Sequence, residues 1–538
     1  MLFSLDKLKP SFGAFVKESD NFTFIPNTSG RNSPLQFTIS DTKSGNHRIL
    51  QLKAKNVTNR TIFINSLVVA EFLIPNFSPD QVLENGWQQC SFSGYRNKVI
   101  PTRKKRFILY RDENSHSFLP EYGYLDKSLV SEWFTELKHK EKSLVIGAIT
   151  TSEQFSQIYV REESAGTRVR ITCQFDSLPI EKGKTFVSEK IALILDDRKK
   201  SLTIFADLLM TQNKLKSLWK PIKGLCCAYY FQGNIVDEKY LLDQLHTIDK
   251  LHKKIKIKYI QIDAGYSSWG DWLDTGKKFP SGMKFVVDEI KKRGMKAGIW
   301  IAPFVANPKS NLFKNHPDWF LKNSKGNHFE ARSSSPLDFL PPLSFRALDP
   351  THPKVKEHLT QIIKTFVSWG FELIKIDFTY TACFGVKYHQ PVTRAKALRI
   401  GLETIRKAAG EKIHILSGIS PLSPLLGIVD SARVGLDSIS PQVCKFPIIR
   451  KIVNSFMLRE NLRNCEARQF FNNKIWINDA DCFVCRPNTG LSRILQDKHF
   501  EFIRNYGGSV WFGDNLKLLD QERISKYVVS LSGNNKSE

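Results

Sequence analysis

The chain has 538 residues, of which 41% are hydrophobic and 25% are charged, and this composition is typical of globular domains with large cores. The length predicts two or three domains, and the hydrophobic content excludes a chain that is mainly disordered. Lys and Arg number 79 against 53 Asp and Glu, and the resulting net charge of +26 favours contact with polyanions without specifying nucleic acid.

Two basic runs, at 102–106 and 253–258, are short and lack the interleaved aromatic residues of a single-strand binding groove. We therefore expect no specific nucleic-acid partner. No apolar run reaches the ~18 residues of a membrane-spanning helix, and residues 1–15 lack the pattern of a secretory signal. These features predict a soluble protein of the cytoplasm with no membrane span.

The nine cysteines are an odd number in a large chain, which argues against a disulfide framework. Cys482 and Cys485 have C-x-x-C spacing, but no second pair at zinc-ligand spacing accompanies them, and they lie in an apparent strand, DADCFVC. We therefore expect buried thiols rather than metal ligands.

Residues 20–195 read as short segments that alternate between apolar and polar residues and are separated by Gly, Pro, Asn and Ser. This period-two pattern is typical of antiparallel strands, and no long helical pattern interrupts it. We predict an N-terminal antiparallel β-sandwich domain over residues 1–212.

From about residue 224 onward, apolar strand-like segments alternate with helix-like segments. Eight strand candidates lie at 224–230, 258–265, 296–304, 372–379, 413–420, 431–437, 475–483 and 508–514. Helical patterns fill most gaps, but the gap after the fifth candidate is short and Pro-rich, and the segment after the sixth is irregular. The predicted fold class is multidomain β plus α/β, with a catalytic (β/α)8 barrel over residues 213–538 and no separate C-terminal β-domain.

Acidic and polar residues recur at the carboxyl ends of these strands, where such a barrel performs its chemistry. They are Asp263, Asp377, Ser417, Asp437, Asp479, Asp481 and Asp514. Strand alternation places Leu373, Lys375 and Asp377 on one face of the fourth strand and Ile374 and Ile376 on the other. We expect the isoleucines to pack against helices, and Lys375 and Asp377 to point into the barrel mouth.

Two carboxylates from different strands that face one space, with cations beside one of them, can cleave a glycosidic bond. An ionised carboxylate attacks or stabilises the anomeric carbon, and a protonated one donates to the leaving oxygen. Lys375 beside Asp377 would keep that carboxylate ionised, and burial would raise the pKa of Asp437 toward the role of the acid. The alternative for Lys375 and Asp377 is a buried ion pair that only fills the barrel.

Several long motifs in the second half resemble those of the retaining α-galactosidases of glycoside hydrolase family 36. They are IDAGYSSWGDWLDTGKKFPSGM, GMKAGIWIAPF, SNLFKNHPDWF, IKIDF, SPLSPLLGIVDSARVGLD and WINDADCFVCR. The resemblance runs from about 224 to 520, and NGWQQCS at 85–91 is similar to a stretch of that family's N-terminal β-sandwich domain.

The resemblance implies that Asp377 is the nucleophile and Asp437 the acid/base of a double displacement that needs no metal or organic cofactor. It also implies sugar-pocket positions for Asp263, Trp300, Lys375 and Arg433. A weaker prediction of substrate contact is Trp87, for which a place in the sandwich core is the alternative. Another is the pair Asp479 and Asp481, which alternate onto one strand face and for which ion pairs at the barrel rim are the alternative.

The sequence departs from the family pattern around the sugar. The second of two expected acids is Ala264, and a cysteine expected beside the sugar's second carbon is Gly418. The tryptophan-rich motif expected in the first strand reads GLCCA, from Gly224 to Ala228, so aromatic stacking there is lost. A site that loses a hydrogen-bonding partner changes its discrimination steeply. We therefore expect a retaining α-glycosidase that hydrolyses terminal α-galactosides or a closely related α-linked sugar, with altered specificity.

Two other functions stay open at this point. The altered pocket and the net charge of +26 fit a catalytically idle barrel that binds carbohydrate or polyanions. Transglycosylation shares the covalent intermediate of hydrolysis, so sequence does not separate the two. The expected partner is an α-galactoside-type oligosaccharide or glycoconjugate, and the oligomeric state stays open.

Overall fold

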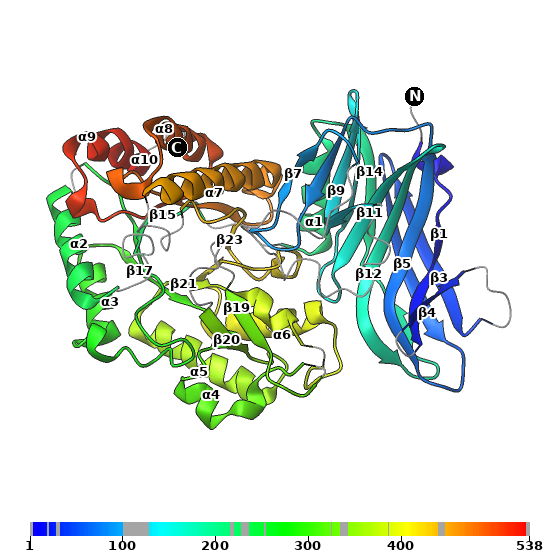
Figure 1. The fold of residues 1–538 in the computed structure, drawn as a ribbon, viewed down its shortest axis with the longest axis horizontal. Helices are drawn as coiled ribbons and strands as arrows, with labels where there is room; N and C mark the ends of the chain where they lie inside the picture. The colour runs from blue at the N-terminus through cyan, green and yellow to red at the C-terminus, as the bar shows by residue number, and fades with distance from the viewer. Residues whose placement is uncertain are drawn as a thin grey trace. The chain divides into compact units, whose positions relative to one another are not determined.

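The computed structural model describes most of the chain (Figure 1). The described residues are 4–18, 21–27, 33–99, 128–215, 220–227, 236–251, 254–323, 325–333, 343–385, 387–439 and 447–533. The chain divides into two compact units. The first contains Met1–Lys216, Tyr388–Arg399 and Pro421–Leu426, and the second contains Ser217–Lys387, Ile400–Ser420 and Gly427–Glu538.

The first unit contains two antiparallel sheets. One has the strand order β2-β1-β5-β12-β11-β8, and the other has the order β13-β4-β14-β10-β9-β6-β7, with β3 paired to β4. The strands are β1 (Ser11–Glu18), β2 (Asn21–Pro26), β3 (Leu35–Ser44), β4 (His47–Asn56), β5 (Ile62–Pro75), β6 (Gln81–Asn85), β7 (Ser93–Arg96), β8 (Leu129–Glu132), β9 (Phe134–His139), β10 (Lys142–Ala148), β11 (Ser156–Glu163), β12 (Gly166–Ile180), β13 (Thr185–Val187) and β14 (Ile191–Asp197). The predicted antiparallel β-sandwich is confirmed.

Alternating burial explains why the period-two pattern predicted these strands. In β4 every second side chain is buried, from Arg48 to Asn56, and the side chains between them are partly or fully exposed. Successive side chains of a strand point to opposite faces, so such a strand covers a core with one face only. The helix α1 (Ser201–Gln212) follows the last strand of this unit.

The second unit is built around a closed barrel of eight parallel strands, in the order β15-β16-β17-β21-β22-β23-β24-β25. They are β15 (Lys223–Cys226), β16 (Tyr259–Ile262), β17 (Lys296–Ile301), β21 (Leu373–Ile376), β22 (His414–Ser417), β23 (Ser431–Arg433), β24 (Ile477–Phe483) and β25 (Ser509–Phe512). Each overlaps one of the eight candidates, so the predicted barrel is confirmed. Residues 228–230 of the first candidate lie outside the described residues.

Helices connect the barrel strands. They are α2 (Glu238–Leu251), α3 (Gly282–Lys292), α4 (Asn311–Asn315), α5 (Pro353–Trp369), α6 (Arg394–Ala409), α7 (Pro447–Ala467), α8 (Arg493–Tyr506), α9 (Gln521–Arg523) and α10 (Ser530–Ser532). Pro353 starts α5, and Gly370, with a φ of 97°, ends it three residues before β21 begins. Among the described residues, no helix is both long and apolar enough to cross a membrane.

The structure differs from the prediction after the sixth strand, where an irregular segment was expected and the 21-residue helix α7 is found. Its buried face carries asparagines among the apolar residues. Asn454 donates to the carbonyl of Thr489 at 2.7 Å, and Asn461 donates to the carbonyl of Ala480 at 2.8 Å. These polar anchors interrupt the apolar period by which an amphipathic helix is recognised.

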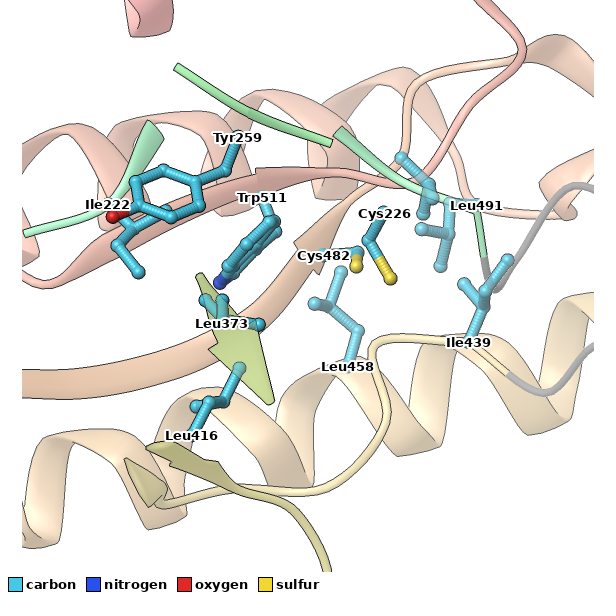
Figure 2. Packing of buried hydrophobic residues seen from close by; sticks show 11 residues of the cluster. Ile222, Cys226, Tyr259, Leu373, Leu416, Ile439, Leu458, Cys482, Leu491 and Trp511 are labelled. Atoms are coloured by element: carbon cyan, nitrogen blue, oxygen red, sulfur yellow. The ribbon is translucent and has the colours of Figure 1, made fainter. Parts of the chain in front are cut away.

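Leu373 marks the inner face of β21. It belongs to a buried cluster with Tyr259, Leu416 and Trp511, which come from three other strands of the barrel (Figure 2). Gly224 leaves room for this packing, because a Cβ there would lie 2.3 Å from Cζ3 of Trp511. The barrel interior is therefore a packed core below the strand ends.

A three-stranded sheet lies between β17 and α5 in the sequence. Its order is β18-β20-β19, with β18 (Val305–Ala306), β19 (Glu330–Ser333) and β20 (Leu343–Ala347). Phe345 of β20 stacks on Trp269, with ring centroids 4.2 Å apart. This sheet thus supplies an aromatic side chain to the loop that follows β16.

We predict that Leu373→Ala lowers the free energy of unfolding by about 2 to 5 kcal/mol, because it removes a fully buried side chain from the barrel core. Chemical denaturation followed by tryptophan fluorescence measures the change. The matched control is Leu518→Ala, whose side chain is 61% exposed and whose loss should cost less than about 0.5 kcal/mol. Equal effects of the two variants would contradict the assigned core.

Candidate functional site

The candidate site lies at the carboxyl ends of six neighbouring strands of the barrel, β16 to β24 in barrel order. The residues are Asp263 after β16, Trp300 of β17, Lys375 of β21, Asp377 after β21, Gly418 after β22, Arg433 of β23, Asp437 after β23, and Asp479 and Asp481 of β24. Parallel closure brings these ends to one edge, so residues far apart in the sequence lie together.

Asp377 is held by three N–H groups. Its Oδ1 accepts from the backbone amides of Phe378 at 2.8 Å and Ile419 at 2.6 Å, and its Oδ2 accepts from Nε1 of Trp300 at 3.0 Å. Phe378 has a φ of 51°, which is uncommon for a residue other than glycine and typical of strained functional sites. The three donors stabilise a negative charge at Asp377 and fix the direction of its carboxylate.

Gly418 makes this position of Asp377 possible. A Cβ at residue 418 would lie 2.4 Å from Cγ of Asp377 and 2.5 Å from its Oδ1. Side-chain atoms cannot approach that closely, so any larger residue would push the carboxylate away from the amide of Ile419. Gly418, which departs from the family pattern in the sequence, is therefore required for the observed position of the Asp377 carboxylate.

Lys375 lies on the inner face of β21, two residues beyond Leu373. Its Nζ donates to Oδ2 of Asp263 at 2.9 Å, and the two side chains are 7% and 8% exposed. The hydrogen-bonded partner of Lys375 is thus Asp263, whereas the sequence argument had paired it with Asp377. The reason is that β16 and β21 flank β17, and inward side chains of alternate barrel strands meet in one layer.

Asp263 is surrounded by further donors. Its Oδ2 accepts from Nε2 of Gln261 at 2.5 Å and from Sγ of Cys226 at 3.4 Å, and its Oδ1 accepts from the amide of Ala264 at 2.9 Å. Burial acts to lower the pKa of Lys375, but the negative charges of Asp263 and the neighbouring groups outweigh it and raise this pKa well above its usual value. Lys375 therefore remains a cation at neutral pH.

Arg433 holds two acids with one nitrogen. Its Nη1 lies 2.9 Å from Oδ1 of Asp437 and 3.2 Å from Oδ1 of Asp481. Oδ2 of Asp481 accepts the amide of Ser438 at 2.7 Å, and Oδ1 of Asp479 accepts the amide of Asp481, also at 2.7 Å. A chain of contacts therefore joins β24 to the loop that carries Asp437.

The acids of this cluster do not share one electrostatic environment. Burial raises the pKa of Asp437, Asp481 and Asp377 add to the rise, and Arg433 opposes it. The side chain of Asp437 is still 37% exposed, so solvent reaches it. Burial also raises the pKa of Asp479 to about 6, against the effect of Arg433. A protonated Asp437 can donate a proton to a bound molecule.

Aromatic rings cover one side of Asp377. Trp269 has ring centroids 5.2 Å from Trp300 and 5.1 Å from Phe378, and it stacks on Phe345. Trp272 lies 5.6 Å from Trp300. Such rings can pack against the apolar face of a ligand and lower the local polarity.

Three positions that the sequence analysis singled out remain: Asp479, Trp87 and Ala228. Asp479 pairs in register with Arg433 across β23 and β24 and lies behind Asp481. Trp87 belongs to the first unit, where it makes an edge contact with Phe155 at 5.6 Å, and its contact with substrate stays a prediction. Ala228 lies outside the described residues.

Sequence reasoning missed the donors that hold the acids. The amides of Phe378 and Ile419 carry no sequence signature, and Gly418 was noted only as a lost cysteine. The register shift in β24 between Asp479 and Cys482 was also missed, because alternation alone describes a regular strand. The sequence signal that could have indicated this irregularity was the pair of aspartates in NDADCF.

The arrangement contains one carboxylate fixed by N–H donors and another, partly exposed, with a raised pKa. These are the groups that an attack at carbon followed by proton donation requires. Within the described residues, no group of three or more His, Cys, Asp or Glu side chains is placed to hold a metal ion. The residues present therefore offer acid, base and nucleophile chemistry.

Comparison with known proteins finds similarity to α-galactosidases over part of the chain. Residues 239–383 match the family model of melibiase. Mel36A, an α-galactosidase of Lactobacillus acidophilus, is 36% identical over 87 residues, which are 15% of this chain and 12% of that protein. AgaA, an α-galactosidase of Geobacillus stearothermophilus, is 28% identical over 120 residues, 21% of this chain and 16% of AgaA. The alignments thus span less than a fifth of these relatives.

The fold is similar to solved structures over nearly the whole chain. TtGalA, an α-galactosidase from Thermus thermophilus in complex with p-nitrophenyl α-D-galactopyranoside, has a TM-score of 0.66 and 21% identity, covering 92% of this chain and 95% of TtGalA. A variant of AgaA from Geobacillus stearothermophilus in complex with raffinose has a TM-score of 0.63 and 13% identity, covering 98% of this chain and 72% of the variant.

We predict that Lys375→Met lowers the free energy of unfolding by about 3 to 5 kcal/mol, because it leaves the buried charge of Asp263 without its cation. Denaturant titration measures the loss. The double variant Lys375→Met, Asp263→Asn should cost less than the sum of its single variants. The control Lys284→Met breaks an ion pair whose lysine is 67% exposed and should cost at most about 1 kcal/mol. Additive single effects would contradict the coupling.

Proposed function

We propose that the protein is a retaining α-glycosidase. The match of residues 239–383 to the melibiase family model and the similarity of the chain to GH36 α-galactosidases support this proposal. The substrates are terminal α-galactosides or closely related α-linked sugars. The observation that carries the proposal is a pair of unlike acids at the carboxyl ends of β21 and β23, which flank β22 in the barrel. Asp377 is held by three N–H donors, and Asp437 is partly exposed and has a raised pKa.

Asp377 is the nucleophile in this proposal. An oxygen of its carboxylate attacks the anomeric carbon, and the electron pair of the breaking C–O bond stays with the leaving oxygen. The proton of Asp437 is transferred to that oxygen, so a neutral alcohol leaves and a glycosyl ester of Asp377 forms. The N–H donors of Phe378, Ile419 and Trp300 direct the attacking carboxylate.

Asp437, now deprotonated, acts as the base of the second step. It removes a proton from water, the water oxygen bonds to the anomeric carbon, and Asp377 leaves as a carboxylate. Two displacements at one carbon restore the original configuration. The mechanism uses side chains of this chain alone.

The other predicted residues support sugar binding in the proposal. Lys375 and Arg433 are cations at the strand ends and can donate to sugar hydroxyls, and Trp300 can pack against the ring. Asp263 supports the site by accepting a hydrogen bond from Lys375, and Asp479 supports it by accepting one from the amide of Asp481. Trp87 is proposed as a contact contributed by the first unit.

The proposed substrate class follows from the ligands of the similar structures. TtGalA was solved with p-nitrophenyl α-D-galactopyranoside and with stachyose, and an AgaA variant with raffinose. An α-galactoside oligosaccharide or glycoconjugate is therefore the first candidate. Ala264 and Gly418 replace larger side chains of the family pattern, which favours a sugar modified at the positions they face.

The domain boundaries and the location are also proposals. We propose a sandwich domain over 1–212 and a barrel domain over 213–538. The two compact units support this division, although the first unit also includes Tyr388–Arg399 and Pro421–Leu426. The location in the cytoplasm stays a prediction from the sequence.

We predict that the wild-type protein hydrolyses at least one of a panel of aryl α-glycosides headed by p-nitrophenyl α-D-galactopyranoside. Asp377→Ala should lower kcat/KM by at least about 10³-fold, because the covalent intermediate cannot form. Proton NMR of the first product should show the α-anomer.

The control is Asp430→Asn, which removes a partly buried carboxylate at the amino end of β23 and should leave kcat/KM unchanged. Thermal unfolding verifies that each variant is folded. A folded wild-type protein without turnover on the whole panel, or a β-anomer as first product, would refute the proposal.

A further inference from the structure

Asp481 contacts the chain on both sides of Asp437. Its Oδ1 lies 3.2 Å from Nη1 of Arg433, four residues before Asp437, and its Oδ2 accepts the amide of Ser438, the next residue, at 2.7 Å. The side chain of Asp481 is 3% exposed. One buried carboxylate therefore fixes both ends of the short segment that carries Asp437.

Arg433 completes this arrangement. The same Nη1 that contacts Asp481 also donates to Oδ1 of Asp437 at 2.9 Å, and the guanidinium is 3% exposed. The planar guanidinium has a fixed fork of donors, so a second carboxylate on it restricts where the first can lie. Asp481 thus acts on Asp437 through a shared cation and through the backbone.

The backbone of β24 is shaped to present Asp481. Between Asp479 and Cys482 the register against β25 shifts, so that three steps along β24 oppose two along β25, which is a β-bulge. Asp481 has a φ of 72°, and its amide is held by Oδ1 of Asp479 at 2.7 Å. Cys482 joins the barrel core directly after it. In a regular strand the side chains of Asp481 and Cys482 would point to opposite faces. The bulge breaks this alternation at Asp481.

We propose that Asp481 is a positioning residue for Asp437, which holds the carboxyl group in place and sets the pH range over which it carries a proton. The proposal rests on the proposed role of Asp437 as acid/base. Asp481 itself is buried, and it acts on Asp437 through its contacts with Arg433 and with the amide of Ser438.

The charge of Asp481 gives the direction of the effect. A negative charge beside Asp437 favours its protonated form and contributes to the raised pKa of Asp437, whereas Arg433 acts in the opposite direction. Asn at position 481 keeps an oxygen that can accept the amide of Ser438 but removes the charge. Asp437 should then lose its proton at lower pH. The charged or titratable groups that face this pair are Arg433, Asp377, Asp479, Lys375, His499, Cys465 and Cys482. Burial raises the pKa of both thiols, so they are neutral near pH 7.

These neighbours do not reproduce the effect of Asp481. Asp377 acts on Asp437 only as a charge, without a hydrogen bond between the two in the described structure. Burial lowers the pKa of His499 to about 4, so its imidazole is neutral near pH 7. Asp479 contacts the amide of Asp481 and not that of Ser438. Asp481 is thus the acid that is linked to the Asp437 segment by both geometry and charge.

The test measures the titration of Asp437 directly in the full chain, labelled with ¹³C at the aspartate carboxyl carbons. Its signal is assigned by its loss in Asp437→Asn. In Asp481→Asn we expect the titration midpoint of Asp437 to fall by about half to one pH unit, because one like charge close to a partly exposed acid is removed. An unchanged or higher midpoint overturns the proposal.

Asp514→Asn is the matched control. Asp514 also ends a barrel strand, is buried, accepts backbone amides of Cys485 and Arg486, and pairs with the Arg486 guanidinium at 2.7 Å. It has the same chemistry as Asp481 without contact to the Asp437 segment in the described structure. Its removal should leave the midpoint of Asp437 unchanged, and an equal shift in both variants also overturns the proposal.

Kinetics supply a second readout. Asp481→Ala loses the charge and the bond to Ser438, so kcat/KM on a methyl α-glycoside should fall by about 10- to 100-fold, part of what a positioned general acid supplies. The loss should be smaller on a p-nitrophenyl glycoside, whose leaving group needs little protonation, and Asp481→Asn should recover part of it. Equal losses on both substrates overturn the positioning role.

A wild-type protein without turnover but with the expected NMR shift would refute the proposed function and leave this proposal standing.

Discussion

Closure of the parallel barrel is the constraint on which the site depends. Each strand contributes only one or two polar residues at its carboxyl end, and these positions are spread from Asp263 to Asp481 along the chain. A closed sheet gives every strand two neighbours and puts all carboxyl ends on one edge. The inner core of Leu373, Leu416 and Trp511 fills the barrel below that edge, so the charged residues are held at its mouth.

The second constraint is the balance of charge at this edge. Within the candidate site, Lys375 and Arg433 are two cations among the five acids Asp263, Asp377, Asp437, Asp479 and Asp481. Each cation has a fixed place, since Lys375 pairs with Asp263 and Arg433 is shared by Asp437 and Asp481. Burial raises the pKa of Asp437 and of Asp479, and the neighbouring acids add to the rise, whereas Arg433 opposes it. Different acids at one edge can thus take different protonation states at one pH.

The sequence predicted the elements that follow from periodicity and missed those that depend on individual contacts. The eight barrel strands were predictable because most of them are short apolar runs that are followed by a polar residue. Helix α7 was not, because Asn454 and Asn461 occupy its buried face. The alternation of β21 placed Lys375 and Asp377 on one face. The partner of Lys375, however, depends on which strand lies two positions away in the barrel, and the sequence pattern does not specify this. The contacts of Asp481 depend on a bulge that no local pattern specifies.

Gly418 shows how one position can couple geometry to selectivity. The absent side chain gives the carboxylate of Asp377 the space in which it reaches the amide of Ile419. A larger residue at 418 would displace Asp377 from Ile419 and from the orientation that Trp300 supports. Selectivity at this position therefore cannot change independently of the nucleophile, whereas Ala264 lies beside Asp263 and does not contact Asp377 through any described hydrogen bond.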